Sequence, residues 1–246
     1  YLARAGPPGL PRHRMGDADV VGDLPRLIVF DLDGTLIDSC RDLAESANEL
    51  IVELGGTPLP EDTIAGMVGG GAALLVHRAL DAAHLAHSPS AVTRFLEIYD
   101  TRLLNHTRLY DGIDRLLHAA RPHAGLAVLT NKPAGPTERL LEAFEVLPLF
   151  DQVTGGDGPY GRKPEPEGLL ALIASAGATP ARTLVVGDSA VDLDTAQRAS
   201  ARCCIVSYGF GFKRFPRERL READWVVDDV RGLSEIVERF VGVRSG

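Results

Sequence analysis

The feature that most constrains the fold of this chain is a short apolar run that ends in carboxylates. Residues 27–30 are Leu-Ile-Val-Phe, and Asp31, Asp33 and Gly34 follow at once. Four consecutive apolar, β-prone residues are typical of a strand buried on both faces of a parallel sheet. Ligand sites in such sheets lie beyond the carboxyl ends of the strands, where Asp31 and Asp33 would lie. We therefore expect chemistry at this point, with Asp31 as a nucleophile and Asp33 as its acid–base partner.

The second half of the chain alternates between strand and helix patterns. Helical spacing at residues 113–121, 137–144, 165–176, 192–199 and 233–240 alternates with strand patterns at residues 126–129, 152–154, 183–186, 203–207 and 225–227. Strands that alternate with helices form βαβ units and a parallel sheet. The prediction is an α/β fold, with a Rossmann-like parallel sheet core and helices on both faces.

A long helical stretch separates the first strand from the others. A helix follows Asp38 or Ser39, either of which can cap it, and helical spacing continues to about Arg108 with no strand pattern. We expect an inserted all-helical cap domain at residues 39–108, with residues 26–38 and 109–246 forming the catalytic core. Residues 1–25 are rich in Pro, Gly and Arg, and are expected to be a flexible N-terminal tail in which Met15 is a candidate native start.

The net charge and the cysteines limit the possible partners and the compartment of the protein. A net charge of −8 argues against nucleic acid as a partner, because that binding depends on cations that neutralise phosphates. No apolar run is long enough to span a membrane. Three cysteines are a poor disulfide framework and have no metal-ligand spacing. We expect a cytoplasmic protein, a monomer or a homodimer, that binds a small molecule.

Polar residues also follow the later strands. Thr130 and Asp188 each end a predicted strand, and Lys163 lies in the loop after another. Alone, each has an ordinary structural explanation, such as a turn, a helix cap or a loop cation. Together they would converge on one edge of a parallel sheet, beside Asp31. This joint placement favours a phosphoryl-transfer site.

Four motifs in this order resemble those of the haloacid dehalogenase superfamily: DLDGT at 31–35, LTNK at 129–132, GRKPEP at 161–166 and GDSAVDLD at 187–194. The resemblance implies that Asp31 attacks phosphorus to form an aspartyl-phosphate. It implies that Asp33 protonates the leaving alkoxide and then deprotonates the hydrolytic water. The phosphoryl oxygens would be held by Gly34, Thr130, Asn131 and Lys163.

Several carboxylates and a phosphate tolerate one another only with a cation between them, and Mg²⁺ suits such oxygen ligands. The side chains of Asp31 and Asp188 are the expected ligands, and the resemblance adds the backbone carbonyl of Asp33. Asp192, four residues after Asp188, is expected to orient Lys163 or the waters of the metal.

Within the superfamily, the presence of Asp33 disfavours the dehalogenases. Residues 38–108 contain no lysine, which excludes a hydrolase that forms a Schiff base from a cap lysine. From Leu27 to the last helix, the chain is similar to bacterial phosphoglycolate phosphatases, although Gly70 and Asp111 depart from their usual pattern. That resemblance implies hydrolysis of 2-phosphoglycolate to glycolate and phosphate.

Other functions stay open at this point. They are a phosphatase for pyrophosphate or for a sugar or amino-sugar phosphate, a phosphomutase similar to β-phosphoglucomutase, and a non-catalytic phosphate-binding module.

Other polar features are interpreted as structural. His84 and His87 have a spacing that suits a shared metal, but no third ligand is evident, so surface histidines are expected. A basic loop contains Lys213, Arg214, Arg217, Arg219 and Arg221, with Glu218 and Glu222 interleaved, and is expected to be a solvated face. Cys40, Cys203 and Cys204 are expected to be small core residues.

Overall fold

The structure is a computed structural model, which describes residues 25–243. The tail expected at residues 1–25 therefore lies outside the described residues, apart from Pro25. Within the described part of the chain, no helix is both long enough and apolar enough to cross a membrane.

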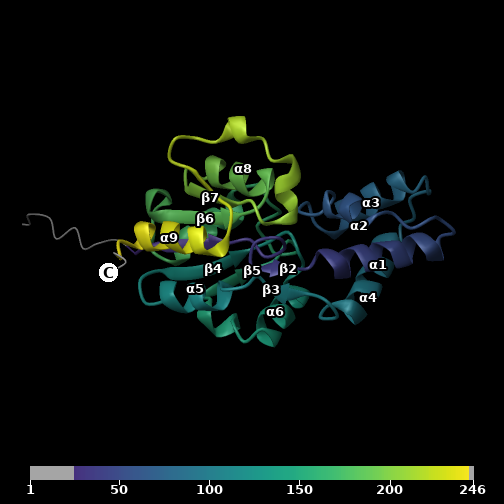
Figure 1. Cartoon of the computed structure of the whole chain (residues 1–246), viewed down its shortest axis with the longest axis horizontal. Helices are drawn as coiled ribbons and strands as arrows, with labels where there is room; N and C mark the ends of the chain where they lie inside the picture. The colour runs from purple at the N-terminus through teal and green to yellow at the C-terminus, as the bar shows by residue number, and fades with distance from the viewer. Residues whose placement is uncertain (1–24, 244–246) are drawn as a thin grey trace, which may run out of the picture.

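The core is a six-stranded, all-parallel sheet with the order β5-β4-β1-β6-β7-β8 (Figure 1). The central strand pairs with β4 on one side and β6 on the other, so that Phe30 lies beside Val128 and Val186. The bounds are β1 Leu27–Phe30, β4 Gly125–Leu129, β5 Gln152–Thr154, β6 Thr183–Gly187, β7 Arg202–Val206 and β8 Trp225–Val227. The predicted parallel α/β sheet is confirmed.

Helices cover both faces of the sheet. Alternate side chains of β1 point to opposite faces, so Ile28 and Phe30 join one apolar core, and Leu27 and Val29 join the other. The first core includes α5 (Ile113–Ala120), α6 (Ala134–Ala143) and α9 (Val230–Val241), and the second includes α7 (Glu167–Ser175) and α8 (Ala190–Arg198). These helices start and end within one turn of their predicted positions.

Four helices form a separate layer at the end of the molecule opposite the C-terminus (Figure 1). They are α1 (Cys40–Glu53), α2 (Glu61–Ala65), α3 (Ala72–Ala82) and α4 (Ala91–Arg102). The helix α1 packs on both α2 and α4, around side chains such as Ile64, Leu80 and Phe95 that are almost fully buried. The predicted helical character of this stretch is confirmed, whereas its status as a separate cap domain stays a prediction.

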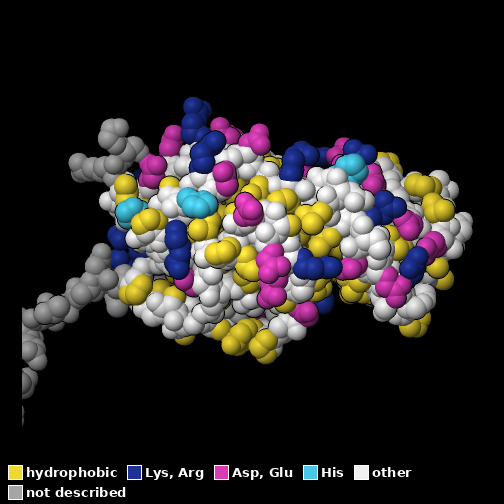
Figure 2. Space-filling model, turned by 90° about the horizontal axis from the view of Figure 1, so that it is seen from below, with side chains coloured by type: hydrophobic (Ala, Val, Ile, Leu, Met, Phe, Trp, Pro, Cys, Tyr) yellow, Lys and Arg dark blue, Asp and Glu magenta, His cyan; other side chains and the backbone are white. Residues whose placement is uncertain are grey.

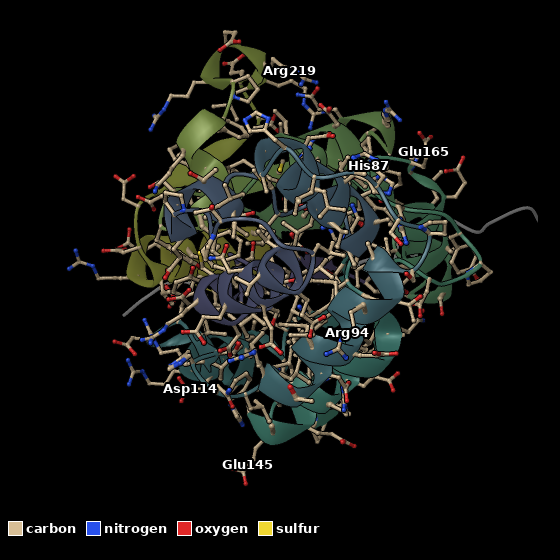
Figure 3. All side chains as sticks on the ribbon, turned by 90° about the vertical axis from the view of Figure 1, so that its right-hand side faces the viewer. His87, Arg94, Asp114, Glu145, Glu165 and Arg219 are labelled. Carbon is tan, nitrogen blue, oxygen red and sulfur yellow. The ribbon has the colours of Figure 1, made fainter. Side chains whose placement is uncertain are left out.

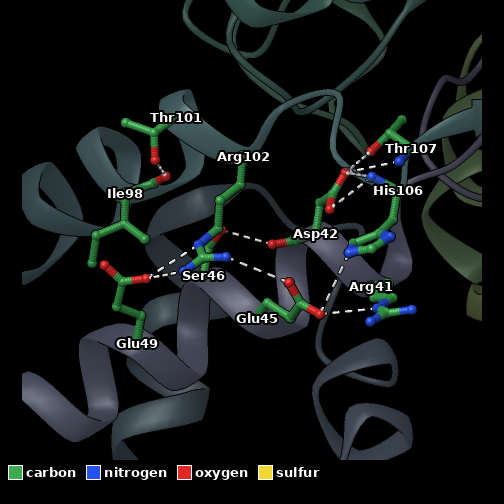
Figure 4. A network of polar contacts seen from close by, with 10 residues as sticks. All are labelled: Arg41, Asp42, Glu45, Ser46, Glu49, Ile98, Thr101, Arg102, His106 and Thr107. Atoms are coloured by element: carbon green, nitrogen blue, oxygen red, sulfur yellow. Dashed lines mark hydrogen bonds and ion pairs between the residues drawn. The ribbon is translucent and has the colours of Figure 1, made fainter.

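A small two-stranded ladder at the base of this layer was not predicted. Strand β2 (Ile37–Asp38) pairs antiparallel with β3 (Arg108–Leu109), which joins the segment that enters the helical layer to the one that leaves it. Two-residue strands are too short to produce an alternating pattern. Next to the ladder, the buried carboxylate of Asp42 accepts hydrogen bonds from the backbone N–H groups of His106 and Thr107 and from the Thr107 hydroxyl (Figure 4).

Charged side chains of both signs are mixed on one face of the molecule. On the face shown in Figure 2, cationic and anionic groups alternate rather than gather into patches of one sign. In the end-on view, Asp114, Glu145, Glu165 and Arg219 project from the periphery (Figure 3). Within residues 25–243, short 3₁₀ turns connect the core elements at Leu147–Leu149 (η1), Pro180–Arg182 (η2), Phe210–Arg214 (η3) and Arg217–Arg219 (η4).

Candidate active site

Asp31 and Lys163 form a buried ion pair at the carboxyl end of β1. The Lys163 Nζ atom lies 2.8 Å from Asp31 Oδ1 and 2.7 Å from Asp192 Oδ1. The other carboxylate oxygen of Asp192 accepts hydrogen bonds from the backbone and hydroxyl of Ser189, in a capping box at the start of α8. The cap fixes Asp192, and Asp192 holds the ammonium group against Asp31.

Asp188 completes a cluster of three buried carboxylates. Carboxylate oxygens of Asp31, Asp188 and Asp192 all lie within 4.8 Å of one another. Asp188 follows β6 and accepts a hydrogen bond of 2.8 Å from the backbone N–H of Gly211. Gly34 passes so close that a Cβ atom built on it would lie 1.9 Å from Asp188 Oδ2.

The carboxylate cluster fits a divalent cation. Three carboxylates face a single ammonium group, that of Lys163, and buried charge of one sign is costly unless it is neutralised. Burial raises the pKa of Asp31 to about 7, although Lys163 opposes this shift. Burial, followed by the charges of Asp192 and Asp31, raises the pKa of Asp188 well above its ordinary value. Oxygen donors of this kind suit a hard cation.

Thr130 and Asn131 follow β4 on the same edge of the sheet. Both are buried, and the Thr130 hydroxyl accepts a hydrogen bond from the backbone N–H of Lys132. The Asn131 amide donates to the backbone carbonyls of Gly69 and Lys163, at 2.9 and 3.0 Å. Asn131 thereby ties the glycine stretch of the helical layer to the loop that carries Lys163.

Asp33 has partners that the sequence did not reveal. Its carboxylate accepts a hydrogen bond of 2.6 Å from the Ser39 hydroxyl and lies 2.9 and 3.1 Å from Lys132 Nζ. Ser39 stands at the expected N-cap position of α1, but the expected capping bond is absent because the hydroxyl turns toward Asp33. The carboxylate of Asp33 is thus not part of the carboxylate cluster of Asp31, Asp188 and Asp192, and the expected role of its backbone carbonyl as a metal ligand stays a prediction.

Lys132 and Tyr99 are the site residues that sequence reasoning missed. The Lys132 ammonium lies 4.5 Å from the centre of the Tyr99 ring, on the side of the site that faces α4. Burial disfavours the charged form of Lys132, but Asp33 and Tyr99 together outweigh this effect and raise the pKa of the lysine. Two signals pointed to Lys132: it is the last residue of the LTNK motif, and the chain has only three lysines.

A cavity opens between the strand ends and the helical layer. Asp31, Asp33, Thr130, Asn131 and Lys132 line it from the sheet side. The other side is mainly apolar, with side chains of Leu43, Val68, Leu75, Phe95, Leu96 and Tyr99 from the helical layer. A small molecule in this cavity would have its polar end on the carboxylates and its other end under the helices.

The remaining candidate groups lie away from this cavity. His87 pairs with Asp81 at 2.8 Å and stacks on His77, and neither His84 nor His87 belongs to a metal-compatible cluster within residues 25–243.

Three cations of the basic loop form ion pairs. Lys213 pairs with Asp62, Arg219 with Asp194 and Arg221 with Asp224.

Among the cysteines, Cys203 and Cys204 are buried in the sheet as expected, and Cys40 is half-buried. All three are free thiols.

The fold and this site define a class of protein. A parallel sheet with an Asp-x-Asp pair after its central strand, and with Thr, Lys and Asp after its neighbours, is the arrangement that the four motifs led us to expect. The family model of the haloacid dehalogenase-like hydrolases matches residues 28–206, and the chain belongs to this family. The prediction of an enzyme of the hydrolase class is thereby confirmed.

Within this family, the chain is similar to several proteins named phosphoglycolate phosphatase. The chain is 36% identical to a phosphoglycolate phosphatase of Pseudomonas putida over 219 residues, which covers 86% of this chain and 79% of the relative. It is 34% identical to the phosphoglycolate phosphatase of Haemophilus influenzae, covering 86% of this chain and 98% of the relative. The crystal structure of a predicted phosphoglycolate phosphatase from Haemophilus somnus superposes with a TM-score of 0.79 at 30% identity, covering 86% of this chain and 97% of the other.

Proposed function

We propose that this protein is a Mg²⁺-dependent phosphatase that hydrolyses 2-phosphoglycolate to glycolate and phosphate through an aspartyl-phosphate on Asp31. The observation that carries the proposal is the buried cluster of Asp31, Asp188 and Asp192, in which Lys163 pairs with Asp31 and Asp192 and in which Asp31 lines a small cavity. The choice of substrate is supported by the relatives, several of which are phosphoglycolate phosphatases at 34–38% identity.

Asp31 is the nucleophile of the proposed reaction. Within the described residues, both of its side-chain contacts are made by Oδ1, which leaves Oδ2 to attack phosphorus. A bond forms between Oδ2 and phosphorus as the bond from phosphorus to the ester oxygen breaks. Lys163 offsets the negative charge that develops on the phosphoryl oxygens, and the Thr130 hydroxyl and nearby backbone N–H groups bind those oxygens.

Asp33 is the general acid and base of the proposed reaction. Its carboxyl group gives a proton to the leaving alkoxide, and the resulting carboxylate then takes a proton from the water that attacks the aspartyl-phosphate. Hydrogen bonds from Ser39 and Lys132 fix the orientation of this carboxylate. Phosphate and free Asp31 are the products of the second step.

The side chains of Asp31 and Asp188, with the backbone carbonyl of Asp33, would hold Mg²⁺. When bound, the ion masks the charge of the carboxylates and of the phosphate dianion. Asp192 is already occupied by Lys163 and Ser189, so we assign it to positioning Lys163.

We place the reaction in the cytoplasm, on a small phosphorylated metabolite, with the protein as a monomer or homodimer. The three free thiols are compatible with a reducing compartment.

Phosphate release from a panel of esters tests the function. We expect 2-phosphoglycolate to have a higher kcat/KM than pyrophosphate, sugar phosphates and amino-sugar phosphates, and turnover to stop when Mg²⁺ is chelated. Preference for another ester would overturn the substrate, and transfer of phosphate to a sugar without release would indicate a phosphomutase. Release that persists without any divalent cation would overturn the metal requirement.

A further inference from the structure

The cavity wall carries a cation, Lys132, that the proposed phosphoryl transfer uses only to orient Asp33. Lys132 is one of few lysines in this chain, and it is buried. Its ammonium lies on the cavity wall between Asp33 and Tyr99. The two other lysines are Lys163, which contacts Asp31, and Lys213, which is exposed. Asp33 neutralises the charge of this buried ammonium, but the group has three N–H donors and can serve a further acceptor as well.

An unpartnered hydroxyl accompanies this cation. The Tyr99 side chain is 3% exposed and lines the same cavity. Within residues 25–243 its hydroxyl makes no hydrogen bond of normal geometry, and the Lys132 ammonium with which it interacts can only donate, so the Tyr99 O–H lacks an acceptor. A buried hydroxyl without a partner costs free energy, which a ligand that accepts its hydrogen bond would recover. Lys132 and Tyr99 together thus offer two donors to one acceptor group.

The position of Asp33 shows which part of a substrate would meet them. If Asp33 protonates the leaving ester oxygen, that oxygen lies next to the Asp33 carboxylate, and Lys132 Nζ is 2.9 Å from the same carboxylate. A substituent on the carbon that bears the ester oxygen therefore lies beside Lys132. We propose that Lys132 and Tyr99 form a subsite for a carboxylate attached to the carbon that bears the ester oxygen. This inference rests on the proposed function and names the feature of the substrate that the site recognises.

The rest of the cavity disfavours the other esters. Beyond Lys132 and Tyr99, the helical layer presents Leu43, Val68 and Leu75, with Phe95 and Leu96 nearby. The hydroxyl groups of a sugar would lose their hydrogen bonds with water against these side chains. An ammonium group has three N–H donors, so Lys132 can serve a carboxylate and Asp33 together, whereas the second phosphate of pyrophosphate would bring more charge than one cation offsets.

A ratio of two rates tests this subsite. The readout is kcat/KM for 2-phosphoglycolate divided by kcat/KM for ethyl phosphate, which has the same carbon skeleton but no carboxylate. Any general effect on Asp33 changes both rates and cancels in the ratio. We expect Lys132→Met to lower the ratio about 10- to 100-fold, the range for loss of a hydrogen bond between charged groups. Lys213→Met, which removes an exposed lysine, is the matched control and should leave the ratio unchanged.

Tyr99→Phe tests the subsite independently, with the same ratio of rates, even if Lys132→Met does not fold. The substitution removes only the unpartnered hydroxyl, so the fold should be retained, and we expect the ratio to fall about 2- to 10-fold. Equal losses on both esters in Lys132→Met, or an unchanged ratio in Tyr99→Phe, would overturn the subsite and leave the proposed function intact. Release of phosphate from neither ester by the native protein would instead refute the proposed function, and the subsite with it.

Discussion

Replacement of Gly34 by alanine, compared with the same change at Gly55, separates two contributions to stability: the backbone conformation of the glycine and its close contact with Asp188. Gly34 has a φ of +83°, a conformation that costs an alanine about 1–2 kcal/mol, and its Cβ would lie 1.9 Å from Asp188 Oδ2. Gly55 has a nearly identical φ of +82°, but a Cβ there meets nothing within 4 Å. The pair of substitutions therefore shares the backbone cost and differs only in the collision with Asp188.

We expect Gly55→Ala to lower the free energy of unfolding by about 1–2 kcal/mol and to leave kcat unchanged. Gly34→Ala adds an overpacking cost of about 1–3 kcal/mol, because Asp188 is buried and packed against other backbone. Displacement of Asp188 should also weaken Mg²⁺ binding and lower kcat about 100-fold. Urea unfolding, Mg²⁺ titration and phosphate release measure these three quantities. Equal unfolding energies and equal Mg²⁺ affinities for the two variants would refute the reasoning.

Three further predictions follow from buried charges. Lys163→Met leaves Asp31 and Asp192 without their cation, so urea unfolding of the metal-free variant should show a free energy of unfolding about 3–5 kcal/mol lower than that of the native protein. The variant should also release almost no phosphate, and retention of native turnover would contradict this. The pKa of Asp31 rises from 3.8 to about 7 on folding, so between these values the folded state keeps a proton that the unfolded state loses. The free energy of unfolding, measured with a chelator present, should therefore decline between about pH 4 and pH 7. A decline of the same size in Asp31→Asn would show that another group causes it. Asp42→Ala removes the acceptor of three hydrogen bonds at the base of the helical layer, including the Thr107 hydroxyl, and should cost about 2–4 kcal/mol by thermal or urea unfolding, whereas a change within error would show that water replaces the carboxylate.

The core of the fold and most of the site were predictable because both depend on local patterns. Buried parallel strands read as short apolar runs, and the polar residues that end those runs meet at one edge of the sheet whatever the order of the strands. Asp31, Lys163 and Asp188 come together in the structure for this reason. The chain order of the motifs is enough to predict that meeting.

The partners of Asp33 were not predictable, because they depend on how the helical layer packs against the sheet. The Ser39 hydroxyl would cap α1 by local rules, and only the position of Asp33 draws it away. Tyr99 reaches Lys132 from α4, which periodicity identifies as a helix but does not orient toward the sheet. The β2–β3 ladder was missed for a similar reason, since each of its strands exists only through pairing with the other.

The central claim is that Asp31 carries the phosphoryl group during turnover. The most direct measurement is acid quenching of the native protein during hydrolysis of 2-phosphoglycolate with Mg²⁺, followed by mass spectrometry of the peptide that contains Asp31. We predict a phosphoryl adduct on that residue, which hydroxylamine removes, and neither adduct nor phosphate release from Asp31→Asn. Undiminished phosphate release by Asp31→Asn, or an adduct confined to another residue, would contradict the account.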